Sequence, residues 1–332
     1  MAPPPSTLRE TGLRQYLVLT HGLPSRDCIR RVLMALKPEA FQQCFQDWIA
    51  AAIQVEDTQT KRLVAMDGKT CRGSQDAGQN LGSLHIVSAG ASEEGMALGQ
   101  VATDENSNEI TAIPQLLKPI ALTNTIVTMD AMGCQKEMAQ DIVQGGGDFV
   151  LAVKDNPPRL REAIENHFVD RLDCEVESLR YRMVETTESG HGRIDERSYC
   201  VTRIPKAWSM KSEWPWVQAM GYSVRITRHA DGRVTDEVRY SILSQYLSGK
   251  RFREAVRGHG SIESMHWVLD VTFREDDSRT RERTLGDNLS WLRRFAVTLL
   301  KRHPVQDSIR GKMLRCQMST DFLAKVLTFQ ED

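Results

Sequence analysis

Apolar residues recur along this chain with two different periods, and the changes between them predict the order of its elements. From residue 24 to 53 the apolar positions fall three or four apart, which predicts two amphipathic helices broken near Pro38. From about residue 61 the apolar residues form the short runs RLVAMDG, SLHIVSAG and MALGQVAT, separated by turn residues. Three strands in succession predict an antiparallel meander.

The middle of the chain alternates between the two periods. The helical pattern NEITAIPQLLKPI is followed by the apolar strand TIVTMD, the helix QKEMAQDIV, a Gly-Gly-Gly stop and the strand DFVLAVK. A strand, a helix and a second strand form a βαβ unit, so the meander is expected to continue into parallel strands. The pattern therefore predicts an α/β fold, with one mixed sheet and helices on its faces.

A second block of β-type runs interrupts this pattern. After a predicted helix at 158–168, strand patterns dominate from about 173 to 245, and HADGR between two alternating runs indicates a hairpin. Two helices follow, FREAVRGHGSIESMHWVL and LGDNLSWLRRFAVTLLKR. We therefore expect a helical segment at 1–60, an α/β domain formed by 61–170 and 246–332, and an all-β insertion at 171–245.

Composition excludes several classes of protein. The seven cysteines form no C-x-x-C pair, which argues against zinc ribbons and disulfide frameworks. The start of the chain lacks the apolar core of a signal peptide, and no run approaches the roughly 20 apolar residues of a membrane span. These features predict a reduced, soluble, cytoplasmic protein with no membrane partner.

Charge is balanced over the whole chain but not along it. There are 43 basic and 44 acidic residues in total, whereas residues 250–315 carry 15 Lys/Arg against 9 Asp/Glu. Such a local surplus is compatible with a surface that binds phosphate, and equally with a solvated basic helix face.

One face of the helix after the insertion is too polar to be core. His259, Glu263, His266 and Asp270 follow at steps of four, three and four residues, so they share that face. Taken singly, the two histidines are also compatible with an interface, and Glu263 with a solvated helix glutamate.

Two aspartates are expected at strand ends. Asp67 follows LVAM and Asp130 follows TIVTM, although the first also fits a hairpin turn and the second a helix N-cap or loop. If these strands are neighbours, the two carboxylates lie together and repel each other unless a cation separates them. Hard divalent cations such as Mg²⁺ prefer oxygen ligands, and a pair about 4 Å apart promotes phosphoryl transfer. Asp67, Asp130 and Glu263 together suit such a site.

Several long blocks resemble one protein family. In order they are MDGKTCRGS, LHIVSAG, GQVATDENSNEITAIPQLL, VTMDAMGCQKEMAQDIVQGGGDFVLAVKDN and RGHGSIESMHWVLDVTFREDDSRTR. They are similar to the signature blocks of bacterial insertion-sequence transposases of the DDE class, and most similar to the H-repeat-associated group. The likeness runs from about Gly22 to the end of the chain.

The resemblance implies a ribonuclease-H-like fold with a β-strand insertion before the last acidic residue, and a bacterial, nucleoid-associated DNA transposase. It makes Asp67, Asp130 and Glu263 the catalytic residues and the ligands of two metal ions, Mg²⁺ or Mn²⁺. The enzyme would cleave DNA at the ends of its element and join them to target DNA, as a homodimer in the DNA complex. The expected DNA-binding residues are Arg257, His259, Arg279, Arg281, Arg293 and Arg294.

The chain also departs from the family pattern. Gly90 and Gly260 stand where the group usually has tryptophan, and the family's upstream helical segment is missing, so we expect an N-terminally truncated form. His259 and Asp270 replace the arginine and the lysine of better-known relatives. Two alternatives stay open: a transposase relic that binds DNA without cutting it, and a zinc metallohydrolase using His259, Glu263 and His266.

Overall fold

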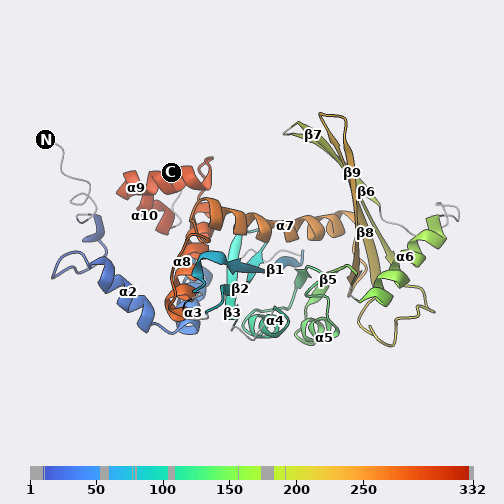
Figure 1. The fold of residues 1–332 in the computed structure, drawn as a ribbon, viewed down its shortest axis with the longest axis horizontal. Helices are drawn as coiled ribbons and strands as arrows, with labels where there is room; N and C mark the ends of the chain where they lie inside the picture. The colour runs from blue at the N-terminus through green and yellow to red at the C-terminus, as the bar shows by residue number, and fades with distance from the viewer. Residues whose placement is uncertain are drawn as a thin grey trace.

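The computed structural model describes most of the chain around a single nine-stranded sheet (Figure 1). The strand order is β3-β2-β1-β4-β5-β9-β8-β7-β6. The described residues are 10, 12–52, 60–76, 78, 81–103, 109–155, 157–172, 183–190 and 192–328. The opening proline run and residues 173–182, where the insertion is expected to begin, lie outside them.

The first five strands form the predicted meander followed by a βαβ unit. Strand β1 pairs antiparallel with β2 and parallel with β4, and β4 pairs parallel with β5. This order and these directions confirm the expected ribonuclease-H-like mixed sheet. The strands are β1 (Arg62–Cys71), β2 (Leu84–Ala91), β3 (Met96–Thr103), β4 (Thr125–Met129) and β5 (Asp148–Val153).

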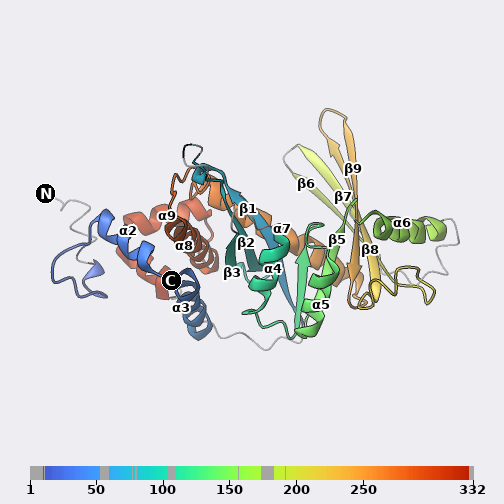
Figure 2. The ribbon, with the colours of Figure 1, turned by 60° about the horizontal axis from the view of Figure 1, so that its bottom comes forward.

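The strands of the insertion extend the same sheet. Strand β9 pairs antiparallel with β5, so the insertion is hydrogen-bonded directly to the first five strands. Its long hairpins project beyond the helical layers (Figure 2). The strands are β6 (Val184–Gly190), β7 (Arg193–Arg203), β8 (Ala219–His229) and β9 (Val234–Leu243). The predicted hairpin at HADGR is confirmed, with Gly232 at φ +83° between β8 and β9.

Helices cover both faces of the meander and βαβ strands, because successive residues of the central strands are apolar and so give each face apolar side chains. Val64 and Met66 of β1 pack with helices α4 and α5 on one face, whereas Leu63 and Ala65 pack with α7 on the other. Figure 1 shows α7 running along the sheet on the side opposite α4 and α5. The helices are α4 (Glu109–Leu117), α5 (Lys136–Gln144), α6 (Pro158–Leu172), α7 (Gly249–Val271) and α8 (Arg283–Arg302).

Two pairs of shorter helices pack around α8. The predicted break near Pro38 is confirmed, because α2 ends at Ala35 and α3 begins at Pro38. The buried amide of Asn288 on α8 donates hydrogen bonds to the carbonyl oxygens of Leu33 and Leu36 at the end of α2. The pairs are α2 (Arg26–Ala35) with α3 (Pro38–Ala52), and α9 (Ile309–Met318) with α10 (Thr320–Thr328). None of the helices in the described residues is long and apolar enough to cross a membrane.

Candidate active site

Asp67 lies inside β1, so the predicted strand end and the alternative hairpin turn at this position are both wrong. The strand continues to Cys71 because each residue from Gly68 onward pairs with β2. Asp67 shares the α7 face of the sheet with Ala65, two residues earlier. Its Oδ2 lies 3.3 Å from Nδ1 of His266.

Asp130 follows the last residue of β4 and is the neighbour of Asp67. The parallel register pairs Met66 with Met129, so the next residue on each strand is an aspartate. Adjacent strands lie about 4.8 Å apart. Oδ1 of Asp130 accepts hydrogen bonds from the amides of Met132 (3.0 Å) and Gly133 (3.3 Å). The helix N-cap alternative is wrong, since the N-cap of α5 is Gln135, and the loop alternative is confirmed.

The polar face of α7 lies against the strands rather than in solvent. Nδ1 of His259 is 3.2 Å from the hydroxyl of Thr128 on β4, and His266 contacts Asp67 on β1. Farther along the helix, Asp270 lies 2.7 Å from the ammonium group of Lys69, also on β1. Glu263 lies on the same face, between the two histidines, and is exposed.

The pKa of His259 is influenced by the charges of all three carboxylates. Burial lowers the pKa of His259 below its ordinary value, and the charges of Asp67, Glu263 and Asp130 oppose that shift. Arg239 of the insertion acts in the same direction as burial. The imidazole is therefore neutral at pH 7, and it does not itself supply a positive charge to the carboxylates.

The chemistry of the donor set fits a hard divalent cation. The charges of three carboxylates, on β1, directly after β4 and on α7, act on the neutral imidazole of His259, and carboxylate oxygens are the ligands that Mg²⁺ prefers. No group of three or more His, Cys, Asp or Glu side chains within the described residues converges closely enough to hold a metal ion as arranged. The zinc alternative has the weaker geometry, because His259 and His266 face different strands.

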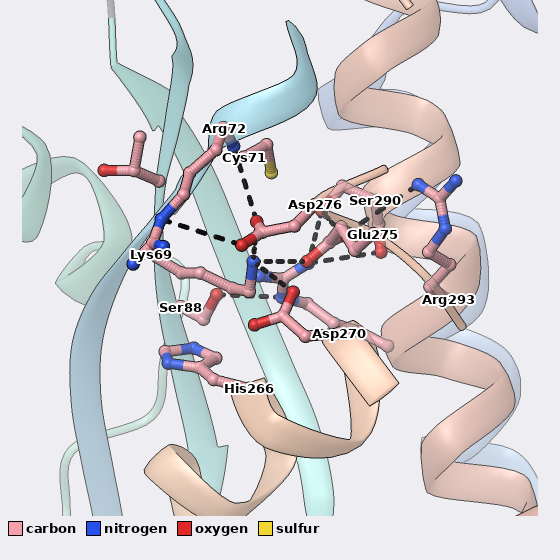
Figure 3. Close-up of polar contacts among 12 residues, drawn as sticks. Lys69, Cys71, Arg72, Ser88, His266, Asp270, Glu275, Asp276, Ser290 and Arg293 are labelled. Atoms are coloured by element: carbon pink, nitrogen blue, oxygen red, sulfur yellow. Dashed lines mark hydrogen bonds and ion pairs between the residues drawn. The ribbon is translucent and has the colours of Figure 1, made fainter. Parts of the chain in front are cut away.

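A buried charge cluster surrounds Lys69, which follows Asp67 by two residues on β1 (Figure 3). Lys69 contacts Asp270 at 2.7 Å, Asp276 at 2.9 Å and Glu275 at 3.6 Å. Burial disfavours charge on both Lys69 and Glu275, yet the pKa of Lys69 is raised and that of Glu275 is lowered. The opposite charges around each group therefore outweigh its loss of hydration. The cluster joins β1 to α7, α8 and the segment between these helices.

The six predicted DNA-binding residues have different environments. The prediction for Arg294 is wrong, because its guanidinium is 0% exposed and is bonded to Ser88 and Glu275. Arg281 donates a 2.6 Å hydrogen bond to the carbonyl oxygen of Gly73. Of the others, Arg257 and Arg279 are exposed, and Arg293 and His259 are partly buried.

The insertion contributes arginines that were not predicted. An open hollow of about 270 Å³ lies between the insertion and α7, and His259 and Glu263 form part of its wall. Its basic residues are Arg197, Arg225, Arg239 and Arg257. The first three lie on adjacent strands β7, β8 and β9, on one face of the sheet. Side chains point alternately to the two faces along each strand, so the sequence gives the residues that share a face of one strand, but only pairing brings the strands together.

The two glycines that flank His259 have different surroundings. A Cβ atom at position 258 would lie 3.3 Å from Cβ of Ser92 and 3.4 Å from Leu63, which is a tight fit against the sheet. At position 260 its nearest neighbour would be Oε2 of Glu263, 4.0 Å away. Gly258 therefore allows close packing of α7, whereas Gly260 leaves space at the wall of the hollow.

Comparison with known proteins gives a consistent family. Residues 58–299 match the family described as "Transposase DDE domain", and residues 6–49 match the one described as "DDE_Tnp_1-associated". The chain is 35% identical over 321 residues to the H repeat-associated putative transposase YhhI of Escherichia coli strain K12, covering 95% of this chain and 83% of that protein. It is 33% identical over 320 residues to the putative transposase YncI of Escherichia coli O157:H7, covering 95% and 80%.

One solved structure is distantly similar. It is the piggyBac transposase synaptic complex with hairpin DNA, with a TM-score of 0.41 and 11% sequence identity. The alignment covers 91% of this chain and 61% of that chain.

Proposed function

Because this chain belongs to the transposase DDE family, we propose that it cleaves DNA at the ends of an insertion sequence and joins them to target DNA. Asp67, Asp130 and Glu263 are the catalytic carboxylates of this proposal. Both reactions are displacements at phosphorus, which need an activated hydroxyl group and a stabilised leaving oxygen.

One observation carries the proposal. Asp67 and Asp130 each come directly after the paired residues Met66 and Met129 of neighbouring parallel strands. Glu263 lies on the face of α7 whose histidines contact these two strands. The charges of all three act on the single imidazole of His259, which supports their closeness. A fold alone carries many functions, but three carboxylates gathered from segments nearly 200 residues apart are specific to a site.

The residues of the chain orient these carboxylates before DNA arrives. His266 holds Oδ2 of Asp67, and two backbone amides hold Oδ1 of Asp130. In this proposal the other oxygen of each aspartate binds the metal ions. When bound by Asp67, Asp130 and Glu263, two divalent ions, Mg²⁺ or Mn²⁺, would activate the attacking hydroxyl group and neutralise charge on the leaving oxygen.

DNA is the substrate of this proposal, and the arginines around Glu263 are its phosphate contacts. Arg257 from α7 and Arg239 from the insertion border the same hollow as Glu263, so a strand crossing the hollow would pass Glu263. The exposed Arg279 belongs to the same proposal. Two copies of the chain would pair the two ends of the element, as a homodimer on DNA.

Cleavage of end-containing DNA tests the proposal. The full chain is incubated with a labelled duplex from the flanks of its gene, with Mg²⁺, with Mn²⁺ or with a chelator. We expect metal-dependent nicking that Asp67→Asn, Asp130→Asn and Glu263→Gln each abolish while DNA binding persists. Asp141→Asn is the matched control, because Asp141 is an exposed aspartate on α5, on the opposite face of the sheet.

A second candidate function is DNA binding without cleavage. Gly260 favours it, because the space beside Glu263 is open where the resemblance expects a tryptophan. Under this alternative the folded protein shifts the mobility of end-containing DNA but produces no nick with either metal. That result would overturn the first proposal, and restored nicking by Gly260→Trp would attribute the loss to this position.

A further inference from the structure

Two polar contacts between helix α7 and β1 have matching spacing. On the helix, His266 and Asp270 are four residues apart, which is about 6 Å along the axis. On the strand, Asp67 and Lys69 are two residues apart, which is about 6.6 Å. His266 meets Asp67 and Asp270 meets Lys69, so the two pairs form successive rungs between the elements.

A third contact fixes the rotation of the helix. His259, seven residues before His266, meets Thr128 on β4, the strand beside β1. A helix held at three points on one face can neither rotate about its axis nor slide along it without breaking a contact. Glu263 lies between His259 and His266 on the helix, so these contacts set the direction in which its carboxylate faces.

In the Lys69–Asp270 pair, Lys69 is the more buried residue and has the additional partners. Its side chain is 7% exposed and also contacts Asp276 and Glu275, whereas Asp270 is 34% exposed. Figure 3 shows Lys69 between Asp270 and Asp276, with His266 one helical turn before Asp270. We therefore expect the lysine to remain in place when its bond to α7 is altered, and the helix to shift.

We propose that the Lys69–Asp270 pair is a positioning device, which sets the height and rotation of α7 so that Glu263 faces Asp67 and Asp130. Neither Lys69 nor Asp270 touches the reacting atoms. The inference rests on the proposed role of the three carboxylates. It adds that the alignment of the three carboxylates depends on Lys69, two residues after Asp67, and on Asp270, seven residues after Glu263.

Asp270→Glu is the central test because it keeps the charge and lengthens the side chain by one methylene. A shift of about 1 Å at a reacting group costs up to about 100-fold in rate. We expect kcat for end cleavage to fall at least tenfold, with KM for DNA and the thermal midpoint unchanged. Asp270→Asn is expected to lower kcat in the same way. Lys69→Arg, which retains a cation at the rung, is expected to keep more activity than Lys69→Met.

The matched control is Glu93→Gln. Glu93 lies in the turn between β2 and β3 and binds Arg251 near the start of α7 at 2.7 Å. This second ion pair on the same helix is distant from Glu263. If Glu93→Gln lowers kcat as much as Asp270→Glu does, or if Asp270→Glu retains full kcat, the positioning role is refuted.

Terbium binding separates this inference from the proposed function. Tb³⁺ occupies sites for hard cations, and the indole of Trp267, 63% exposed one turn after Glu263, sensitises its luminescence. We expect Asp270→Glu to weaken Asp67-dependent Tb³⁺ binding at least fivefold, and Glu93→Gln to leave it unchanged. If the protein binds Tb³⁺ but never cleaves DNA, the proposed function fails and terbium alone decides the positioning role. Unaltered Tb³⁺ affinity in Asp270→Glu would then overturn the positioning role. The absence of any Asp67-dependent Tb³⁺ binding would overturn it as well.

Discussion

Two ion clusters on the same sheet are built in opposite ways. The cluster around Glu275 and Arg294 is buried, with side chains 1% and 0% exposed, and it joins β1, β2 and the segments after α7. The cluster around Asp195 lies on adjacent strands of the insertion, where Arg197 and Arg225 bind the carboxylate at 2.9 Å. The side chains of Arg197 and Arg225 shield the carboxylate of Asp195 from solvent.

The difference concerns which part of the structure each cluster holds together. Lys69 and Asp276 are 207 residues apart, so the buried cluster exists only in the complete fold. Asp195 and Arg225 are 30 residues apart on strands already paired by their backbones. We infer that the first cluster stabilises the packing of α7 and α8 on the sheet. The second arranges arginine side chains at the hollow beside Glu263.

Removing the buried arginine should give the largest effect. Arg294→Met leaves Glu275 without its nearest cation and Ser88 without its donor, so the free energy of unfolding should fall by about 3–5 kcal/mol. Urea unfolding followed by circular dichroism measures the change. A loss below about 1 kcal/mol would contradict the structural role assigned to this cluster.

Asp195→Asn should have a smaller effect on stability, about 1–2 kcal/mol, because its partners are partly solvated. Hydrogen bonds from Arg225 and Thr227 hold the pKa of Asp195 well below its usual value. The contribution of a carboxylate whose folded pKa is lowered is complete above its unfolded pKa, near 4, and disappears as the pH falls further. The difference between wild type and Asp195→Asn should therefore be constant from pH 8 to 5 and shrink below about pH 4. A difference that grows on acidification would contradict this sign.

The exposed arginines of the hollow should affect DNA rather than stability. Arg239→Gln removes one cation from the wall, so the slope of log affinity against log salt should decrease by about 1, with a few-fold loss of affinity. Fluorescence anisotropy at several salt concentrations measures both. Arg233→Gln, at the exposed turn between β8 and β9, is the control and should change neither. Equal slopes for the wild type and Arg239→Gln would exclude Arg239 from the interface.

The smallest effect should come from the glycines of α7. Gly260→Ala adds a methyl group in open space and removes the entropic cost of glycine in a helix, so stability should rise by about 0.5–1 kcal/mol. Gly258→Ala meets Ser92 and Leu63 and should give no gain. Thermal unfolding of the two variants in parallel checks the contrast. Equal stabilisation would mean that α7 does not pack as closely at Gly258 as the structure indicates.

The sheet was predictable because it depends on local periodicity, whereas the end of β1 was not. The D-G pair after Met66 favours a turn, but pairing of residues 68–71 with β2 overrides this preference. The βαβ pattern predicted that β4 and β5 are parallel, whereas the pairing of β1 with β4 was only a condition of the predicted site. Turn signals therefore mislead when a distant strand supplies the missing hydrogen bonds.

Single residues of the site were identifiable by type but not by partner. Arg293 and Arg294 are adjacent in the sequence and chemically identical, yet their side chains are 21% and 0% exposed. His259 and Thr128 are 131 residues apart, and no local pattern relates them. Burial and pairing of this kind arise only from the packing of α7 and α8 on the sheet.

The pairing of β9 with β5 has a consequence for the order of folding. The first half of α7 packs on Tyr199, Val201, Ala219 and Leu243, so the surface on which it packs includes strands of the insertion. A chain emerging from the ribosome completes the insertion before it produces α7, and domains generally form in the order of synthesis. Glu263 is thus the last of the three carboxylates to reach the sheet. Incomplete chains that end before α7 carry both aspartates but no third carboxylate.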